Sequence, residues 1–248
     1  GKPLLATFDE DGLPYTADHM SSSFMKNNIP TIADMTAKAI DQMKDHSNGF
    51  VMQVEGGKVD WAAHANDIAG LLYDQLAFDD AVKVAMDFAK RDGNTLVVIT
   101  TDHGNANPGL IYGKFVNENF DSIQKFNNTN EWILQGIKPT DSIAAVKERI
   151  EKANGSVKIT DDQAKEILSY YHKAEKEDGV YNPKHLPFRT LAEIQKSYTS
   201  VGWISMDHSA DYTELAMYGP GSQDMKPFMK NTDIHAFLLK AAQVENKF

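Results

Sequence analysis

The first 110 residues alternate apolar runs typical of β-strands with stretches that have helical periodicity. The β-type runs are Leu4–Phe8, "GFVMQV" (residues 49–54) and "NTLVVIT" (residues 94–100). Between them lie "TIADMTAKAIDQMKDH" (residues 31–46) and a long amphipathic stretch that Gly93 should end. Strands that alternate with helices are typical of a mostly parallel, doubly wound sheet between helices. We therefore predict an α/β fold of this kind.

The pattern changes in the middle of the chain. Charged helical stretches follow an Asn-rich segment, namely "DSIAAVKERIEKANG" (residues 141–155) and "TDDQAKEILSYYHKAEKEDG" (residues 160–179). We predict that residues 1–112 form the first part of the α/β core, 113–197 a helical insertion near the active edge of the sheet, and 198–248 the last part of the core. The insertion either shapes access to a site or serves packing alone.

Charge and cysteine content restrict the possible functions. The formal net charge is −10 over 248 residues, which argues against nucleic-acid binding and would repel an anionic substrate unless a local cation reverses the field. The chain has no cysteine, so any metal must be bound by Asp, Glu and His side chains. No apolar run is long enough to predict a membrane span.

Side chains suited to metal binding follow the β-type runs. A carboxylate ends the second run, and an Asp and a His four residues apart come directly after it, on one face of a predicted helix. An adjacent Asp–His pair follows the third run, and a further His lies in "MDHSAD" (residues 206–211). The carboxyl ends of parallel strands are where such sheets gather their chemistry. The six candidates are Glu55, Asp60, His64, Asp102, His103 and His208.

The donor types of these six residues suit zinc, with a harder magnesium site near the carboxylates. A catalytic zinc typically takes three protein ligands, so six donors could serve two such ions if other residues complete the second site. Taken singly, a helical Asp–His pair is more often a surface ion pair. The recurrence of such residues at one predicted edge favours the metal site.

Three segments resemble the carboxyl-terminal metal motifs of the alkaline phosphatase family, in the order of that family. They are "VEGGKVDWAAHAND" (residues 54–67), "LVVITTDHGN" (residues 96–105) and "DHSADYTELAMYGPG" (residues 207–221). The resemblance covers residues 1–108 and again about 201–248, and it implies an alkaline-phosphatase-like fold.

The resemblance also implies a ligand set. Asp60, His64 and His208 would bind a first zinc, Asp102 and His103 a second zinc, and Glu55 a magnesium ion. The implied reaction is hydrolysis of phosphate monoesters by a serine nucleophile, with one zinc activating the serine and the other the leaving-group oxygen.

The chain departs from the family pattern in three respects. The serine nucleophile and the other phosphate and metal ligands of the family's amino-terminal half have no match here. We therefore expect a carboxyl-terminal portion that needs the missing amino-terminal segment as a partner and is inactive alone. Trp61, which we assign to the substrate pocket, stands where Lys or His is more usual. Asn105 stands where some members have another His, and should remove a hydrogen-bond partner of a ligand.

Further expectations come from the resemblance alone. Members of the family usually form homodimers and usually lie outside the cytoplasm, which implies a periplasmic or secreted protein. One alternative is a manganese-dependent phosphotransferase similar to the cofactor-independent phosphoglycerate mutases, because "DHGN" (residues 102–105) also resembles an element of theirs. A second alternative is a metal-binding module without catalytic activity.

Overall fold

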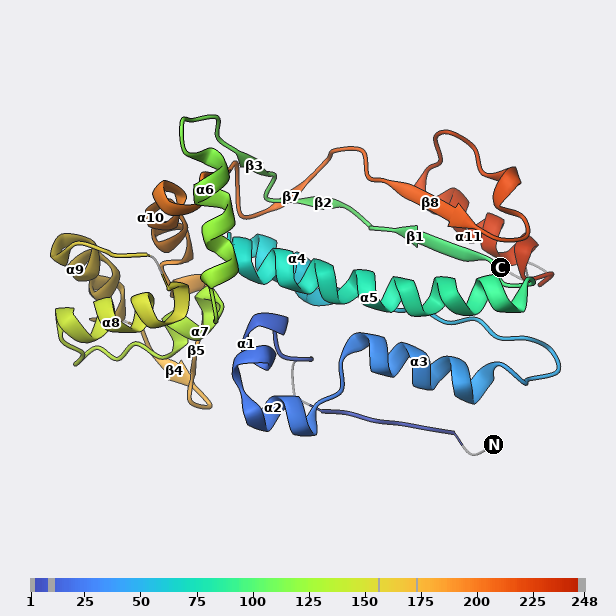
Figure 1. Cartoon of the computed structure of the whole chain (residues 1–248), viewed down its shortest axis with the longest axis horizontal. Helices are drawn as coiled ribbons and strands as arrows, with labels where there is room; N and C mark the ends of the chain where they lie inside the picture. The colour runs from blue at the N-terminus through green and yellow to red at the C-terminus, as the bar shows by residue number, and fades with distance from the viewer. Residues whose placement is uncertain (1–2, 9–11, 156, 173, 245–248) are drawn as a thin grey trace.

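One long helix runs along the middle of the molecule (Figure 1). The computed structural model describes residues 3–8, 12–155, 157–172 and 174–244. The central helix α5 (Ile68–Asp92) follows directly on the short helix α4 (Gly57–His64), and α3 (Ile32–Met43) packs alongside α5. Helices α1 (Thr16–Ser21) and α2 (Ser23–Asn28) lie on the same side of α5 as α3, and strands run along the opposite side.

The helices begin and end where local chemistry favours it. Thr31 caps α3 in a reciprocal capping box, in which its hydroxyl accepts from the Asp34 N–H and the Asp34 carboxylate accepts from the Thr31 N–H. Asp67 caps the start of α5, and Gly93 ends that helix with a φ of 72°. The stretch over residues 31–46 thus forms a helix with its ends trimmed, and the long amphipathic stretch forms a helix that Gly93 ends, as predicted.

The described strands form four two-stranded ladders, and every one of these is antiparallel. The third predicted β-type run forms β1, which pairs with a strand more than 100 residues later. The pairs are β1 (Val97–Thr100) with β8 (Leu215–Tyr218), β2 (Gly104–Asn105) with β7 (His208–Ser209), β3 (Pro108–Leu110) with β6 (Val201–Trp203), and β4 (Lys176–Glu177) with β5 (Val180–Tyr181). The predicted parallel pairing is therefore not formed among the residues that the structure describes.

The first two predicted strands do not pair with any part of the chain that the structure describes. Residues 3–8 and 49–56 form no ladder with any described part of the chain. Phe50 packs against Phe88 of α5, with ring centroids 6.0 Å apart, whereas the next residue, Val51, is 82% exposed. Leu5 is 89% exposed. A strand needs a neighbour to satisfy its backbone N–H and C=O groups, and the described chain supplies none at these two segments.

The middle of the chain is mostly helical, as predicted, although the proposed domain boundaries stay a prediction. This part forms one end of the molecule (Figure 1). Its fully buried side chains include Ile133, Leu134, Ile150 and Leu191, and the same core extends to Ile68 of α5. Its helical elements are α6 (Val116–Asp121), η1 (Ser122–Lys125), α7 (Asn130–Gln135), α8 (Ile143–Asn154), α9 (Asp161–Ser169), η2 (Tyr170–His172), η3 (Pro183–His185) and α10 (Phe188–Thr199).

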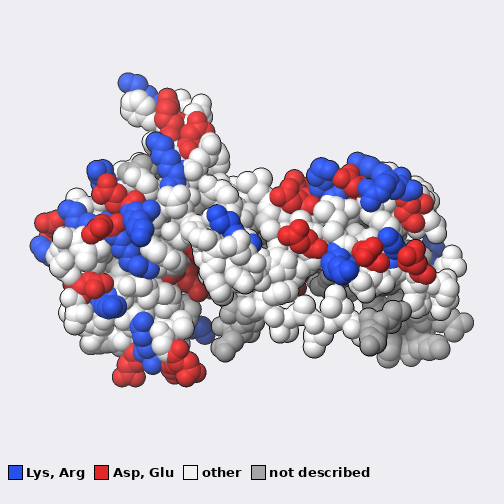
Figure 2. Space-filling model, turned by 60° about the horizontal axis from the view of Figure 1, so that its bottom comes forward, with Lys and Arg blue, Asp and Glu red and all other residues white. Residues whose placement is uncertain are grey.

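The opposite end of the molecule carries η4 (Ser222–Asp224) and α11 (Asn231–Ala241), close to the end of β8 (Figure 1). In the view of Figure 2, charged side chains gather at the two ends of the molecule, and the stretch between them carries few. Among the described residues, no helix is both long enough and apolar enough to span a bilayer.

Two carboxylates, one buried (Asp67) and one half-buried (Asp18), connect α1, α5 and α7. Asp67 accepts hydrogen bonds from the backbone N–H of Gly70 (2.9 Å) and of Asn130 at the start of α7 (2.6 Å). Asp18 of α1 accepts from the Thr129 hydroxyl at 2.6 Å. Burial raises the pKa of the Asp67 carboxyl to about 7, against the lowering effect of its two N–H donors. The helical insertion is thereby tied to the turn that follows α4.

Candidate metal centre

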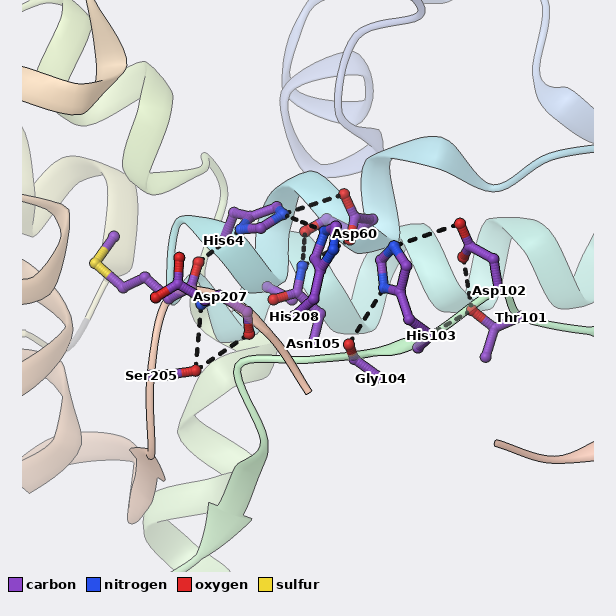
Figure 3. Close-up of polar contacts among 12 residues, drawn as sticks. Asp60, His64, Thr101, Asp102, His103, Gly104, Asn105, Ser205, Asp207 and His208 are labelled. Atoms are coloured by element: carbon purple, nitrogen blue, oxygen red, sulfur yellow. Dashed lines mark hydrogen bonds and ion pairs between the residues drawn. The ribbon is translucent and has the colours of Figure 1, made fainter. Parts of the chain in front are cut away.

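Three of the predicted ligands converge at the end of α4 (Figure 3). Asp60 and His64 lie one turn apart on this helix, and His208 comes from β7. His64 Nε2 lies 3.6 Å from Asp60 Oδ2, and His208 Nε2 lies 3.7 Å from Asp60 Oδ1. The two histidine Nε2 atoms are 3.0 Å apart. One ligand atom of each side chain thus lies within 4.8 Å of the other two, which is close enough to share one ion.

The backbone fixes which nitrogen of His64 faces this group. His64 Nδ1 lies 2.6 Å from the carbonyl oxygen of Met206, and a carbonyl can only accept, so Nδ1 carries the proton. The Nε2 lone pair of a neutral ring then points toward Asp60 and His208. A hydrogen bond that fixes the tautomer in this way is the usual support of a metal-binding histidine.

The second predicted pair adjoins the first group. Asp102 and His103 follow β1, where the chain leaves the ladder, and His103 Nε2 lies 3.3 Å from Asp102 Oδ2. The His103 ring stacks on the His208 ring with centroids 3.5 Å apart and planes inclined by 24°. The side chains of Asp102 and His103 therefore lie next to each other, and their role as ligands of a second ion stays a prediction. They lie beside the group of three rather than within it.

Glu55 and Trp61 lie near α4 but outside the group of three. Glu55 is exposed at the start of the helix, and its carboxylate lies over Gly57, where an added Cβ would be 3.4 Å from Oε1. Trp61 is 42% exposed, and the Lys58 ammonium lies 3.6 Å from the centroid of a Trp61 ring. The roles predicted for Glu55 and Trp61, in magnesium binding and in the substrate pocket, stay predictions.

Asn105 has a role that the sequence analysis missed. Its Nδ2 donates to Asp60 Oδ1 at 2.6 Å and to the Asp60 carbonyl oxygen at 3.2 Å. The expectation that Asn105 removes a hydrogen-bond partner from a ligand is therefore wrong, because the amide itself supplies one. Asn105 faces His208 across the β2–β7 ladder, and this places it beside the group. Its position two residues after His103 was the only signal in the sequence.

Comparison with known proteins identifies the family. A sequence model described as alkaline phosphatase matches residues 1–244. The chain belongs to the alkaline phosphatase family. Alkaline phosphatase 4 of Bacillus subtilis strain 168 is 29% identical over 232 residues, which are 93% of this chain and 46% of that protein. Alkaline phosphatase of Escherichia coli K12 is 34% identical over 155 residues, or 52% of this chain and 33% of that protein.

A solved structure extends the likeness to the fold. The crystal structure of Thermus thermophilus alkaline phosphatase superposes with a TM-score of 0.81 at 25% identity, over 94% of this chain and 51% of that one. The predicted alkaline-phosphatase-like α/β fold is thus confirmed. The chain spans about half the length of the curated alkaline phosphatases that it matches along most of its own length.

Proposed function

We propose that this chain carries the metal-binding part of a zinc- and magnesium-dependent alkaline phosphatase. The observation that carries the proposal is the convergence of Asp60, His64 and His208 on one point. These three side chains would bind a first zinc. Asp102 and His103, which touch the first group through the stacked rings of His103 and His208, would bind a second. Glu55 would bind magnesium.

The donor set of the group of three fits a zinc ion. One carboxylate and two imidazole nitrogens are typical protein ligands of a catalytic zinc, and side-chain exposures of 37–52% leave room for substrate on the open side. When bound, such ions polarise a phosphoryl oxygen and lower the pKa of an attacking or leaving hydroxyl. They would also reverse the field of a chain whose net charge is −10, at the point where a phosphate monoester must bind.

The residues of this chain would hold and orient the reaction centre. His64 keeps its Nε2 directed at the centre through its bond to the Met206 carbonyl, and Asn105 holds the Asp60 carboxylate. Trp61 would form one wall of the substrate pocket, with Lys58 held against its ring. No residue of the chain is assigned as nucleophile, so the serine of the proposed reaction comes from outside it.

We propose that the nucleophile belongs to the amino-terminal half of an alkaline phosphatase, which would pack on the extended segments 3–8 and 49–56. Two observations support this partner. The chain spans about half of its relatives, and these two segments lack ladder partners among the described residues. Their outward side chains, such as Leu5 and Val51, are strongly exposed apolar groups that a neighbouring strand would cover.

The metal assignment is tested by anomalous diffraction at the zinc edge on crystals grown with zinc. A peak between Asp60, His64 and His208 is expected, and it should be lost or strongly weakened in His208→Ala. The matched control is His235→Ala, which removes an exposed histidine of α11. If His208→Ala keeps the full zinc content of the unmodified chain, the ligand assignment is wrong.

The catalytic part of the proposal is tested with p-nitrophenyl phosphate. The chain alone should not hydrolyse it. Together with the amino-terminal half of an alkaline phosphatase, co-expressed as a separate polypeptide, it should do so, and His208→Ala should abolish the gain. Hydrolysis by the chain alone that His208→Ala removes would show that the nucleophile lies within the chain after all.

A further inference from the structure

The turn between α4 and α5 contains a buried asparagine in an uncommon backbone conformation. Asn66 has a φ of 47° and is only 3% exposed. Asparagine is one of the few residues other than glycine that adopts this left-handed region readily. Its side-chain Nδ2 donates to two backbone carbonyls, that of Ala63 in α4 at 3.1 Å and that of Ser205 at 2.8 Å. Asn66 therefore joins the end of α4 to a segment 139 residues further along the chain.

Asn66 hydrogen-bonds to the segment of residues 205–208, which contains His208. His64 Nδ1 donates to the carbonyl of Met206, directly after the Ser205 carbonyl that Asn66 binds. His64 and Asn66 thus donate hydrogen bonds to two consecutive carbonyls of the 205–208 segment. On its other side, the N–H of Ala106 donates to the Asp207 carbonyl at 2.9 Å. With these carbonyls fixed, His208 Nε2 lies 3.0 Å from His64 Nε2.

We infer that Asn66 is a positioning residue for the candidate metal centre, which sets the place of His208 relative to His64. The inference deepens the proposed function and rests on it. The side-chain amide of Asn66 donates to the backbone carbonyl of Ser205, so it acts on His208 through the backbone of the 205–208 segment. His64 makes a bond of the same kind, but a ligand cannot be removed without losing its own donor atom. A substitution of Asn66 can therefore change the orientation of His208 without removing a metal-binding atom.

Two other readings of Asn66 are possible and predict different results. In the first, Asn66 only closes the end of α4 through the Ala63 carbonyl, so its loss lowers stability and leaves the centre intact. In the second, it supports the whole region, so its loss weakens the centre whether or not His208 is present. A positioning role predicts instead that the effect on metal binding depends on the His208 side chain.

The variant Asn66→Gly removes the amide and keeps the backbone free to adopt a positive φ. The matched control is Asn107→Gly, because Asn107 also has a φ of 47° and its Nδ2 donates to Asp211 Oδ2 rather than to the 205–208 segment. If the glycine variant at position 66 does not fold, Asn66→Ser, which keeps a short hydroxyl donor, replaces it. Folding is checked by thermal unfolding with a chelator present.

The first measurement is zinc affinity of the 248-residue chain, by competition with a chromophoric chelator. Asn66→Gly should weaken binding by about 10- to 100-fold, the range known for residues that orient metal ligands, and Asn107→Gly should leave it unchanged. In a His208→Ala background, Asn66→Gly should have no further effect. An equal loss in both backgrounds, or no loss in the unmodified background, overturns the inference.

The second measurement needs no metal. In chain labelled at its histidines and kept in chelator, the His64 and His208 rings should show a nuclear Overhauser effect, which Asn66→Gly removes and Asn107→Gly retains. A persistent signal in Asn66→Gly refutes the positioning role. If the unmodified chain binds no zinc, the proposed function fails, and loss of the ring contact in Asn66→Gly still supports the role of Asn66.

Discussion

The buried carboxylate of Asp67 should make the stability of the chain fall as pH rises toward neutrality. Asp67 is 3% exposed at the start of α5, and burial raises its pKa from 3.8 to about 7. We consider the variant Asp67→Asn, which has nearly the same shape and no charge at any pH. It can still accept one of the two hydrogen bonds that Gly70 and Asn130 donate to Asp67.

The sign and size of the effect follow from proton linkage. Between pH 3.8 and about 7 the folded Asp67 keeps its proton while the unfolded one loses it, so the folded state binds more protons. The free energy of unfolding therefore decreases with rising pH through this interval. The rise of the Asp67 pKa from 3.8 to about 7 corresponds to about 4 kcal/mol in total. Asp67→Asn does not titrate and lacks this decrease.

The assay is urea unfolding at pH 5 and pH 8, followed by circular dichroism. Relative to the unmodified chain, Asp67→Asn should gain stability between the two pH values, by as much as about 3 kcal/mol over the part of the interval above pH 5. Asp80→Asn, an exposed position on the same helix, should show no such gain. A stability difference that is constant with pH, or a relative gain by the unmodified chain, would refute the burial argument.

Two further predictions concern single residues. Asn105→Ala removes the 2.6 Å hydrogen bond to Asp60 Oδ1 and should weaken zinc binding by about 10- to 100-fold in the chelator competition. The thermal stability measured with chelator present should change little. An unchanged zinc affinity contradicts this role. Gly219→Ala should destabilise the chain by more than Gly221→Ala in urea unfolding. Both glycines have a positive φ, and an alanine in this backbone conformation costs about 1–2 kcal/mol of stability. Of these two positions, only Gly219 would place the new Cβ against backbone, 2.1 Å from the Thr95 carbonyl oxygen. This clash should cost about 1–3 kcal/mol more. Equal losses in the two variants would show that this clash relaxes without cost.

The helical elements could be predicted because their causes are local. Thr31 and Asp34 cap α3 from within four residues, and Gly93 ends α5 through its own φ. The placement of Asp60 and His64 on one face of α4 follows from helical spacing in the same way. The three metal motifs were recognisable because each is contiguous in the sequence.

Pairing and convergence depended on contacts between distant residues. The β-type runs at 3–8 and 49–54 have the composition of strands, but a strand forms only beside a partner, and the described chain offers none there. No local pattern predicted that β1 would pair antiparallel with β8, or that Asn105 would face His208.

The sequence by itself determined which side chains were available to bind a metal, since their types and local spacing are covalent properties of the chain. Only the tertiary structure decided that His208 meets His64 across 144 residues, and that Asn66 and Asn105 hold the group together. The physical reason is that these contacts depend on how the 205–208 segment packs between α4 and β2. That packing is a property of the whole fold, which no short stretch of sequence encodes.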